Sequence, residues 1–559
     1  MNRALAPYAL LLLATPALAT VSPLTDSAMH GYVLGRYAFS ADALPTASQY
    51  YEAAQRQDPN DLALRRRSFE LAIVAGDQAH ATALAKQLAA AGQNDATVAF
   101  VRIADAVGRK DWNAVDALRP GLGDAGYAQV ASPIIEAWAQ FGRGNVDAAL
   151  ALLNTAKYSG IANSYVAEQR AHMLAAAGRW DEAADAYHAL LAGIGNGINW
   201  LRVGEADALQ QAGKTQAAAD MLASAPGDLP LAAARARFEA GKRIGALAPT
   251  PAAGIAWMAA RLAADMSRDR PVPLALTMGR IGTFLDPSLD AAWMITGDIL
   301  ARGGKGEAAL AAYAHIGPTD PMAPVVNVRR AQVLQTLDRD KAAGDLLLAA
   351  TAQQGAGIDD WTRLGDWYRS EDRLTDAVTA YDKALSLAKP KDPALWAYYF
   401  QRGSAREQVG DWVGAESDLR MALELAPNEP IVLNYLGYSL LDRGLKLAEA
   451  QALIERAAKF KPDDASILDS LGWAYFRTGQ YEKAVPELER AAAAQPGDPT
   501  INEHLGDAFW RVGRKLEARF RWSAALELDP TEKQKALLKA KLDYGLDVAL
   551  AMAPAAPKK

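Results

Sequence analysis

The stretch that decides the fold is "LDSLGWAYFRTGQYEKA", residues 468–484. It places Gly472 among apolar residues of an otherwise helical pattern, where alanine would favour the helix by about 1 kcal/mol. A second glycine, Gly479, follows, and the helical pattern then resumes. A glycine in mid-helix is explained if another helix passes too close for a side chain, so the arrangement should recur if it serves packing.

The arrangement does recur, every 34 or 35 residues. If Gly472 is position 8 of a repeat, Gly437 and Gly506 hold the same position in the preceding and following copies. Small residues stand at positions 15, 20 and 27 of each copy, and the prolines at position 32 are Pro462, Pro496 and Pro530. Further copies upstream contain Gly35, Gly297, Gly365 and Gly403 at position 8, and weaker copies lie between them.

A 34-residue period with these residue types resembles the tetratricopeptide repeat, whose unit is a pair of antiparallel helices. The resemblance implies an all-α solenoid, a superhelix of about 13–14 helix pairs over residues 28 to 530. Small residues at positions 8, 20 and 27 would let the two helices approach, and glycine at position 15 suits a turn of positive φ. Each repeat is expected to contact mainly its neighbours.

The quality of the repeats suggests how the chain is divided. Residues 28–224 read as an N-terminal, partly degenerate array, and residues 253–530 as a more regular C-terminal array. Between them, "APGDLP" and "APTP" place proline in both connectors of an irregular joint at 225–252. A long loop within one continuous spiral would explain this joint equally well. Residues 531–550 are expected to form a capping helix, followed by a disordered tail at 551–559.

The first residues have the pattern of an export signal peptide, residues 1–19. A positive start at Arg3 precedes the apolar run "ALAPYALLLLAT", and "ALA" at 17–19 fits cleavage after Ala19. A buried N-terminal helix is the alternative explanation. The apolar run is shorter than the roughly 20 residues that span a bilayer. The sequence therefore predicts a periplasmic protein with no transmembrane segment in its mature form.

The composition excludes several kinds of chemistry. The 559 residues carry a formal net charge of -6, which gives no general attraction to nucleic acid. No cysteine is present, so disulfides and thiolate metal sites are ruled out. The six histidines form no HxxxH pair, and no glycine-rich phosphate loop occurs. With the repeats occupying nearly the whole chain, we predict no catalytic residues, no bound metal and no cofactor.

The resemblance implies a non-catalytic scaffold or adaptor that binds proteins along a concave helical surface. Exported members of the family commonly assist envelope assembly or export, so the expected partners are one or more envelope proteins or peptide segments. The alternative is a regulatory or accessory subunit of an envelope polysaccharide or peptidoglycan enzyme. A catalyst built on the repeat surface is a third and weaker hypothesis.

In the family, positions 5, 9 and 12 of the first helix face the concave side. Carried onto the three most regular units, this predicts a partner-binding set of Asn434, Tyr438, Asp469, Trp473, Phe476, Glu503, Asp507 and Trp510. Trp473 is unusual, because the family favours a small polar residue at position 9. Aromatic faces beside carboxylates suit a segment with apolar and basic side chains. Alternatively, Tyr438 and Trp473 pack against neighbouring helices.

Overall fold

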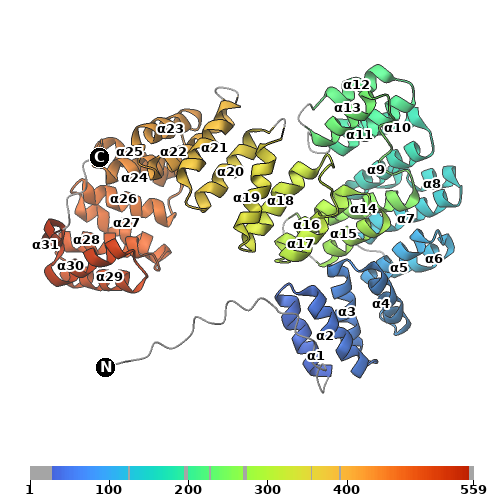
Figure 1. The fold of residues 1–559 in the computed structure, drawn as a ribbon, viewed down its shortest axis with the longest axis horizontal. Helices are drawn as coiled ribbons and strands as arrows, with labels where there is room; N and C mark the ends of the chain where they lie inside the picture. The colour runs from blue at the N-terminus through green and yellow to red at the C-terminus, as the bar shows by residue number, and fades with distance from the viewer. Residues whose placement is uncertain are drawn as a thin grey trace. The chain divides into compact units, whose positions relative to one another are not determined.

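The computed structural model describes residues 28–123, 126–193, 199–225, 228–268, 273–353, 356–388 and 392–552. These residues form 31 α-helices and three short 3-10 helices, and no strand occurs among them (Figure 1). Within this part of the chain, no helix is both long and apolar enough to cross a membrane. The signal peptide predicted at 1–19 lies outside the described residues.

The chain divides into two compact units, Met1–Leu346 and Leu347–Lys559. The helices of the first unit are α1 (Ala28–Ser40), α2 (Leu44–Gln57), α3 (Leu62–Ala75), α4 (Gln78–Ala90), α5 (Ala96–Gly108), α6 (Trp112–Leu118), α7 (Ala128–Gly142), α8 (Val146–Leu152), α9 (Gly160–Ala176), α10 (Trp180–Gly193), α11 (Asn199–Gln211), α12 (Thr215–Ala223), α13 (Leu229–Glu239), α14 (Pro251–Met266), α15 (Pro273–Leu285), α16 (Asp290–Arg302), α17 (Gly306–Tyr313) and α18 (Ala323–Thr336). The boundary between the units falls within α19 (Asp340–Thr351).

The second unit continues the series of paired helices. Its members are α20 (Ile358–Ser370), α21 (Leu374–Ser386), α22 (Trp396–Gln408), α23 (Trp412–Leu425), α24 (Pro430–Asp442), α25 (Leu447–Phe460), α26 (Ala465–Arg477), α27 (Tyr481–Ala494), α28 (Pro499–Arg511), α29 (Lys515–Glu527), α30 (Glu532–Tyr544) and α31 (Leu546–Met552). The second helix of each of the last three repeats ends just before a position-32 proline. The all-α repeat architecture predicted from the sequence is confirmed.

The glycines at position 8 mark the points where paired helices cross. A Cβ atom on Gly472 of α26 would lie 2.5 Å from Cγ of Leu488 on α27, closer than real Cβ contacts come. The same clash would occur between Gly506 and Trp522, again at 2.5 Å. The packing role inferred for Gly472 is therefore confirmed. Gly479, with φ of +79°, forms the turn between the two helices, as position 15 predicts.

The C-terminal cap consists of two helices where the sequence predicted one over 531–550. Thr531 caps α30 by accepting a hydrogen bond from the Gln534 amide at 3.3 Å. Gly545, with φ of +82°, then ends α30 before α31 begins. A side chain on Gly545 would also clash with the ring of Trp510, so this break lets the cap pack closely on α28. The first two residues of the predicted tail, 551–559, belong to α31, and residues 553–559 lie outside the description.

The first unit does not follow the predicted pattern of contacts between neighbouring repeats. Helix α14 packs against α5, α7 and α9, and α15 packs against α3 and α5 (Figure 1). Arg280 of α15 donates hydrogen bonds to the carbonyl oxygens of Ile73, at 3.1 Å, and Val74, at 2.6 Å, at the end of α3. Helices from after residue 250 thus lie on the first helices of the earlier repeats.

This packing places the main division of the chain far from the irregular joint expected at 225–252. That stretch contains α13 and lies inside the first unit. The reason is a shared hydrophobic core that runs from Ala99 to Ile299, so helices before and after the joint bury one another's apolar faces. The boundary between the two compact units falls between Leu346 and Leu347 instead.

Candidate functional site: a groove on the second unit

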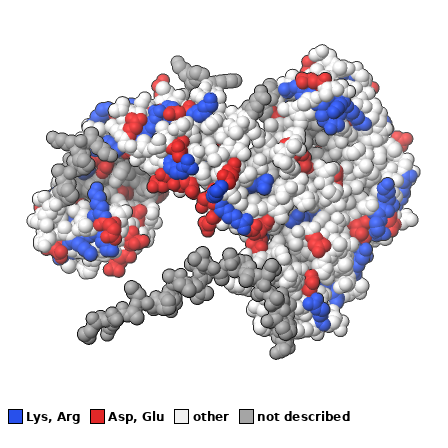
Figure 2. All heavy atoms as spheres, in the orientation of Figure 1, with Lys and Arg blue, Asp and Glu red and all other residues white. Residues whose placement is uncertain are grey.

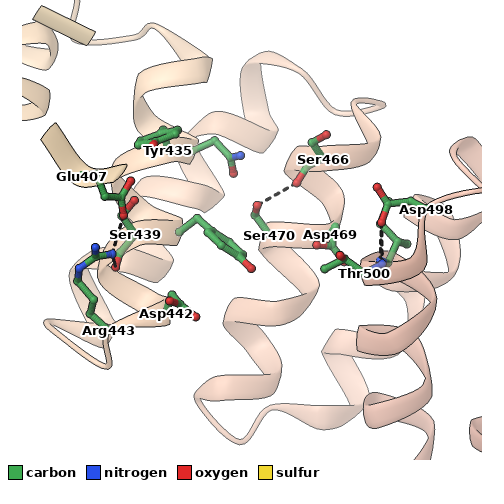
Figure 3. Close-up of a pocket in the computed structure, with 13 residues that line it drawn as sticks. Glu407, Tyr435, Ser439, Asp442, Arg443, Ser466, Asp469, Ser470, Asp498 and Thr500 are labelled. Atoms are coloured by element: carbon green, nitrogen blue, oxygen red, sulfur yellow. Dashed lines mark hydrogen bonds and ion pairs between the residues drawn. The ribbon is translucent and has the colours of Figure 1, made fainter. Parts of the chain in front are cut away.

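A groove of about 390 Å³ lies on the second unit, along the first helices of four successive repeats (Figure 3). The lining comes from α22, α24, α26 and α28 and the residues that flank them. It consists of Glu407, Asn434, Tyr435, Tyr438, Ser439, Asp442, Arg443, Ser466, Asp469, Ser470, Asp498, Thr500 and Ile501. Three of the eight residues predicted from the sequence belong to it, namely Asn434, Tyr438 and Asp469.

Helical geometry explains why these side chains share one surface. Residues four apart lie one above the other on a helix, so Asn434 and Tyr438 both face the groove from α24. The neighbouring first helices are fixed at their starts by side-chain caps. Asp464 accepts hydrogen bonds from the first amides of α26, and Asp498 does the same for α28. Rigid helix starts therefore hold the groove walls in a fixed register.

The side-chain amide oxygen of Asn434 lacks a hydrogen bond in the described part of the chain. It is buried, and it has no hydrogen-bond partner among the described residues. Leaving such an acceptor unsatisfied costs about 1–3 kcal/mol, a cost that a donor from a ligand would remove. Nearby, burial raises the pKa of the Tyr438 phenol, and the Asp469 carboxylate raises it further. The Tyr438 hydroxyl is thus a protonated donor at neutral pH.

The groove is acidic. Its charged lining residues are Glu407, Asp442, Asp469, Asp498 and a single base, Arg443. Arg443 already forms an ion pair, since its guanidinium lies 2.5 Å from the Glu407 carboxylate. The remaining carboxylates favour a ligand that brings positive charge. On the face shown in Figure 2, by contrast, acidic and basic side chains are intermixed over much of the surface.

The negative charge of one groove carboxylate, Asp469, is offset by a neighbouring histidine. The His504 Nδ1 atom of α28 lies 3.0 Å from both oxygens of Asp469. Burial disfavours the charged imidazole, but the Asp469, Glu503 and Asp507 carboxylates outweigh it, so the pKa of His504 lies above its ordinary value. Asp469 therefore contributes less free negative charge to the groove than Asp442, which is exposed.

Two of the predicted aromatic residues form an internal stack. The Trp473 ring lies parallel to Phe476, with centroids 4.7 Å apart, and parallel to His504, with centroids 3.9 Å apart. Phe476 is buried and also contacts Tyr481 edge-on at 5.4 Å. This stack joins α26 to α28, which agrees with the packing alternative for Trp473.

The last three predicted residues lie under the C-terminal cap. Lys541 of α30 is buried, and its ammonium contacts Glu503 at 2.6 Å and Asp507 at 2.8 Å. The indole of Trp510 donates to Asp547 of α31 at 3.2 Å. These contacts occupy the polar atoms of the predicted set on α28, so the open groove ends where the cap begins.

The prediction from the sequence did not include all of the groove residues, although the repeat positions of some of them could have identified them. Ser466 and Thr500 occupy position 2 of their repeats, and Asp442 occupies position 13, next to the predicted face. A wider angular window on each first helix would have included them. Glu407 occupies position 12 of the preceding repeat, a position that the prediction used, and it was missed because the prediction covered only the three following units. No group of three or more metal-ligating side chains occurs among the described residues.

Comparisons with known proteins agree with the fold. The family model described as "Tetratricopeptide repeat" matches residues 400–465 and 470–533, which contain all of the groove lining except Ser466 and Asp469. A TPR repeat-containing protein of Pseudomonas aeruginosa, PA4667, is 32% identical over 197 residues, 35% of this chain and 32% of the relative. The cytochrome c-type biogenesis protein CycH of Rhizobium meliloti is 40% identical over 120 residues, 21% of this chain and 30% of the relative.

The matches to these two relatives span about a third of each relative's length. Among solved structures, a chain of the APC/C hetero-tetramer Cut9–Hcn1 aligns with 94% of this chain and 99% of its own. Its sequence is 14% identical, and the TM-score is 0.39.

Proposed function

Because this chain is a tetratricopeptide-repeat protein, we propose that it is a non-catalytic scaffold of the bacterial envelope whose second unit holds peptide segments of partner proteins. The segment lies along α24, α26 and α28 and carries basic side chains next to apolar ones. The observation that carries this proposal is the groove itself, in which an unsatisfied amide oxygen stands beside exposed negative charge.

The groove chemistry supports recognition of an extended peptide. The Asn434 amide oxygen can accept a hydrogen bond from a main-chain N–H of any peptide, whatever its sequence. Asp442 adds selectivity, since a lysine or arginine near it gains electrostatic energy and an acidic residue loses it. Ile501 and the ring of Tyr438 provide apolar contact for the intervening side chains.

One observation supports the envelope location, and a second supports the role. The pattern at 1–19 has the charge, apolar length and cleavage residues of an export signal. The similarity to a cytochrome c-type biogenesis protein supports a role in making another protein. The export proposal is tested by intact-mass measurement of the protein from its native host. A mature chain beginning at Thr20 in the periplasmic fraction supports the proposal, and a retained Met1 contradicts it.

The peptide proposal is tested with a phage-displayed library of random peptides selected on the full chain. We expect enrichment of sequences with lysine or arginine beside apolar residues. The double variant Asn434→Leu and Asp442→Lys should lose the enriched peptides, because it removes both the acceptor and the free charge. Its helical circular dichroism should equal that of the parent protein.

The matched control is Glu482→Lys, which reverses an exposed charge on α27 outside the groove. This variant should retain the enriched peptides with affinity within about twofold of the parent protein. Enrichment of acidic peptides, or equal retention by the double variant, would show that the groove is not the peptide site.

A further inference from the structure

A buried histidine lies behind one carboxylate of the groove on the second unit. The side chain of His504 on α28 is 9% exposed, and the Asp469 side chain next to it is 10% exposed. The imidazole Nδ1 atom lies 3.0 Å from each of the two Asp469 oxygens. Asp469 lines the groove, with His504 behind it. The histidine is therefore one side chain away from a ligand in the groove.

Two contacts from α26 hold the His504 ring in this position. The Trp473 ring is parallel to it, with centroids 3.9 Å apart. Asp469 accepts the hydrogen bond of the ring edge, which fixes the orientation of the ring in its plane. Because Nδ1 faces a carboxylate, the neutral ring carries its proton on Nδ1. The ring can therefore lose its second proton without losing either contact.

The charges around His504 favour its protonated form. Three carboxylates face it, Asp469 from α26 and Glu503 and Asp507 from α28 itself. The only further cation that contacts this set is Lys541 of α30, 2.6 Å from Glu503 and 2.8 Å from Asp507 among the described residues. Burial disfavours the charged imidazole, but the carboxylates raise the pKa of His504 above its ordinary value of 6.5.

Other polar groups face this set from the neighbouring helices. Tyr438 of α24 keeps its proton at neutral pH, because burial raises the pKa of the phenol. Arg477 of α26 lies near Tyr438 and stays charged. The Trp522 indole of α29 donates to Asp507 at 2.9 Å and carries no charge. Burial raises the pKa of Asp507, and Lys541 opposes that increase.

The charge that a ligand meets at Asp469 depends on the His504 proton. While the imidazolium is present, its positive charge offsets the carboxylate. Loss of the proton leaves a neutral ring that still donates from Nδ1, and Asp469 then presents its full negative charge to the groove. A cationic ligand gains electrostatic energy from that change, and an anionic ligand loses it.

We propose that His504 is a proton switch for the groove, which binds basic peptide segments weakly when this histidine is charged and more tightly when it is neutral. The inference rests on the proposed function, because it concerns regulation of the same groove. Linkage makes the effect reciprocal, so a bound basic segment favours release of the proton from His504. One unit charge at the range of a neighbouring side chain changes affinity about fivefold in a partly hydrated site.

The experiment measures binding of a blocked peptide, acetyl-(Leu-Arg)3-amide, to the full chain by isothermal titration calorimetry. The peptide has no group that titrates between pH 6 and pH 9, so the pH dependence belongs to the protein. We expect affinity about fivefold greater at pH 9 than at pH 6. At neutral pH, titrations in buffers of different ionisation enthalpy should show that binding releases protons.

Variants assign the proton to His504. In His504→Gln, whose neutral amide can still donate to Asp469, the pH dependence and the proton release should both disappear. Asp469→Asn should move the midpoint of the pH dependence to lower pH, because the imidazolium loses its nearest carboxylate. The control is His188→Gln, since His188 also contacts a carboxylate, Glu205 at 3.1 Å, but belongs to the first unit. It should keep the pH profile of the parent protein.

A packing role alone for His504 predicts a different result, in which His504→Gln changes the affinity by the same factor at every pH. That result, or equal affinity of the parent protein at pH 6 and pH 9, would overturn the inference and leave the proposed function standing. No binding of the peptide at pH 9 would contradict both. If His504→Gln loses its helical circular dichroism, proton release by the parent protein and the midpoint of Asp469→Asn decide the question.

Discussion

At Gly472, the missing side chain is what allows α26 and α27 to cross at close range. The substitution Gly472→Leu places atoms where Leu488 already lies, and a Cβ atom there would also come within 3.1 Å of the Ala484 backbone oxygen. Overpacking of this kind costs about 1–3 kcal/mol of unfolding free energy, and more where backbone must move. Urea unfolding of the variant and the parent protein measures it.

The matched control is Gly497→Leu in the connection between α27 and α28. This glycine is exposed, and a Cβ atom there would meet no atom within 4 Å. The control should change stability by no more than about 0.5 kcal/mol. Equal losses in the two variants would contradict the repeat register.

Asp290, in the first turn of α16, makes the unfolding free energy of the protein depend on pH. Burial, followed by the nearby Asp320 and Asp286 carboxylates, raises its pKa to about 7. The folded protein thus holds this proton more tightly than the unfolded chain, where the ordinary value is 3.8. The contribution of Asp290 to stability is therefore lost as the pH rises from about 4 to about 7, and it changes little above that.

The substitution Asp290→Asn removes this titration. We expect the variant to gain more unfolding free energy relative to the parent protein at pH 8 than at pH 5. The gain in unfolding free energy at pH 8 should exceed the gain at pH 5 by about 1 kcal/mol. This figure allows for solvent screening, which weakens the electrostatic effect on a half-exposed group. Asp147→Asn, which removes the charge of an exposed first-turn aspartate of α8, is measured beside it as the control. A gain that is greater at pH 5 would contradict the prediction.

At the scale of helices, a single buried lysine, Lys541, joins the cap to α28. Lys541 lies on the apolar face of α30, three residues after Leu538, and its ammonium faces two acids on α28. Carboxylates at positions 5 and 9 of a final repeat need a cation if another helix covers them. The sequence shows the two acids and the lysine, but Lys541 lies outside the 34-residue repeat. The repeat pattern therefore could not predict that Lys541 pairs with Glu503.

Replacing Lys541 with methionine would leave the Glu503 and Asp507 carboxylates buried without their cation. The loss of one partner of a buried pair costs about 3–5 kcal/mol. Hydrogen exchange should therefore accelerate throughout α30 and α31. Adding Glu503→Gln and Asp507→Asn should restore much of the protection, because it removes the unpaired charges.

The control for this experiment is Lys535→Met on the same helix. Lys535 lies 3.5 Å from the exposed Glu532 carboxylate, and a surface ion pair contributes about 0–1 kcal/mol. Exchange in the cap should be nearly unchanged in this control. Similar acceleration in both variants would show that the buried pairing does not hold the cap.

At the scale of the whole molecule, periodicity in the sequence predicts only what repeats. The 34-residue spacing identifies the helix pairs and the first-helix face that lines the groove. The return of α14 and α15 onto α3, α5, α7 and α9 joins residues far apart in the sequence, such as Arg280 and Ile73, so no local period reveals it. One residue did carry a signal, since Arg280 is the single charged residue of the apolar helix α15.

The last prediction tests this return within the full chain. Burial lowers the pKa of Arg280 to about 10, which leaves it charged at neutral pH while it binds the carbonyl end of α3. Arg280→Ala leaves those carbonyl groups without their donor. Hydrogen exchange followed by mass spectrometry should therefore show faster exchange in 62–75 as well as in 273–285, whereas residues 430–530 of the other unit should keep their protection.

Stacking limited to adjacent repeats predicts a different result, in which the loss spreads from 273–285 into α14 and α16 and leaves α3 unaffected. Arg109→Ala is the control, because Arg109 pairs with Asp105 at the surface, 3.1 Å away, and touches no distant helix through that pair. It should leave both segments protected. Unchanged exchange in 62–75 of the Arg280→Ala variant would mean that α15 does not stabilise α3, and that the first unit holds together through its repeats alone.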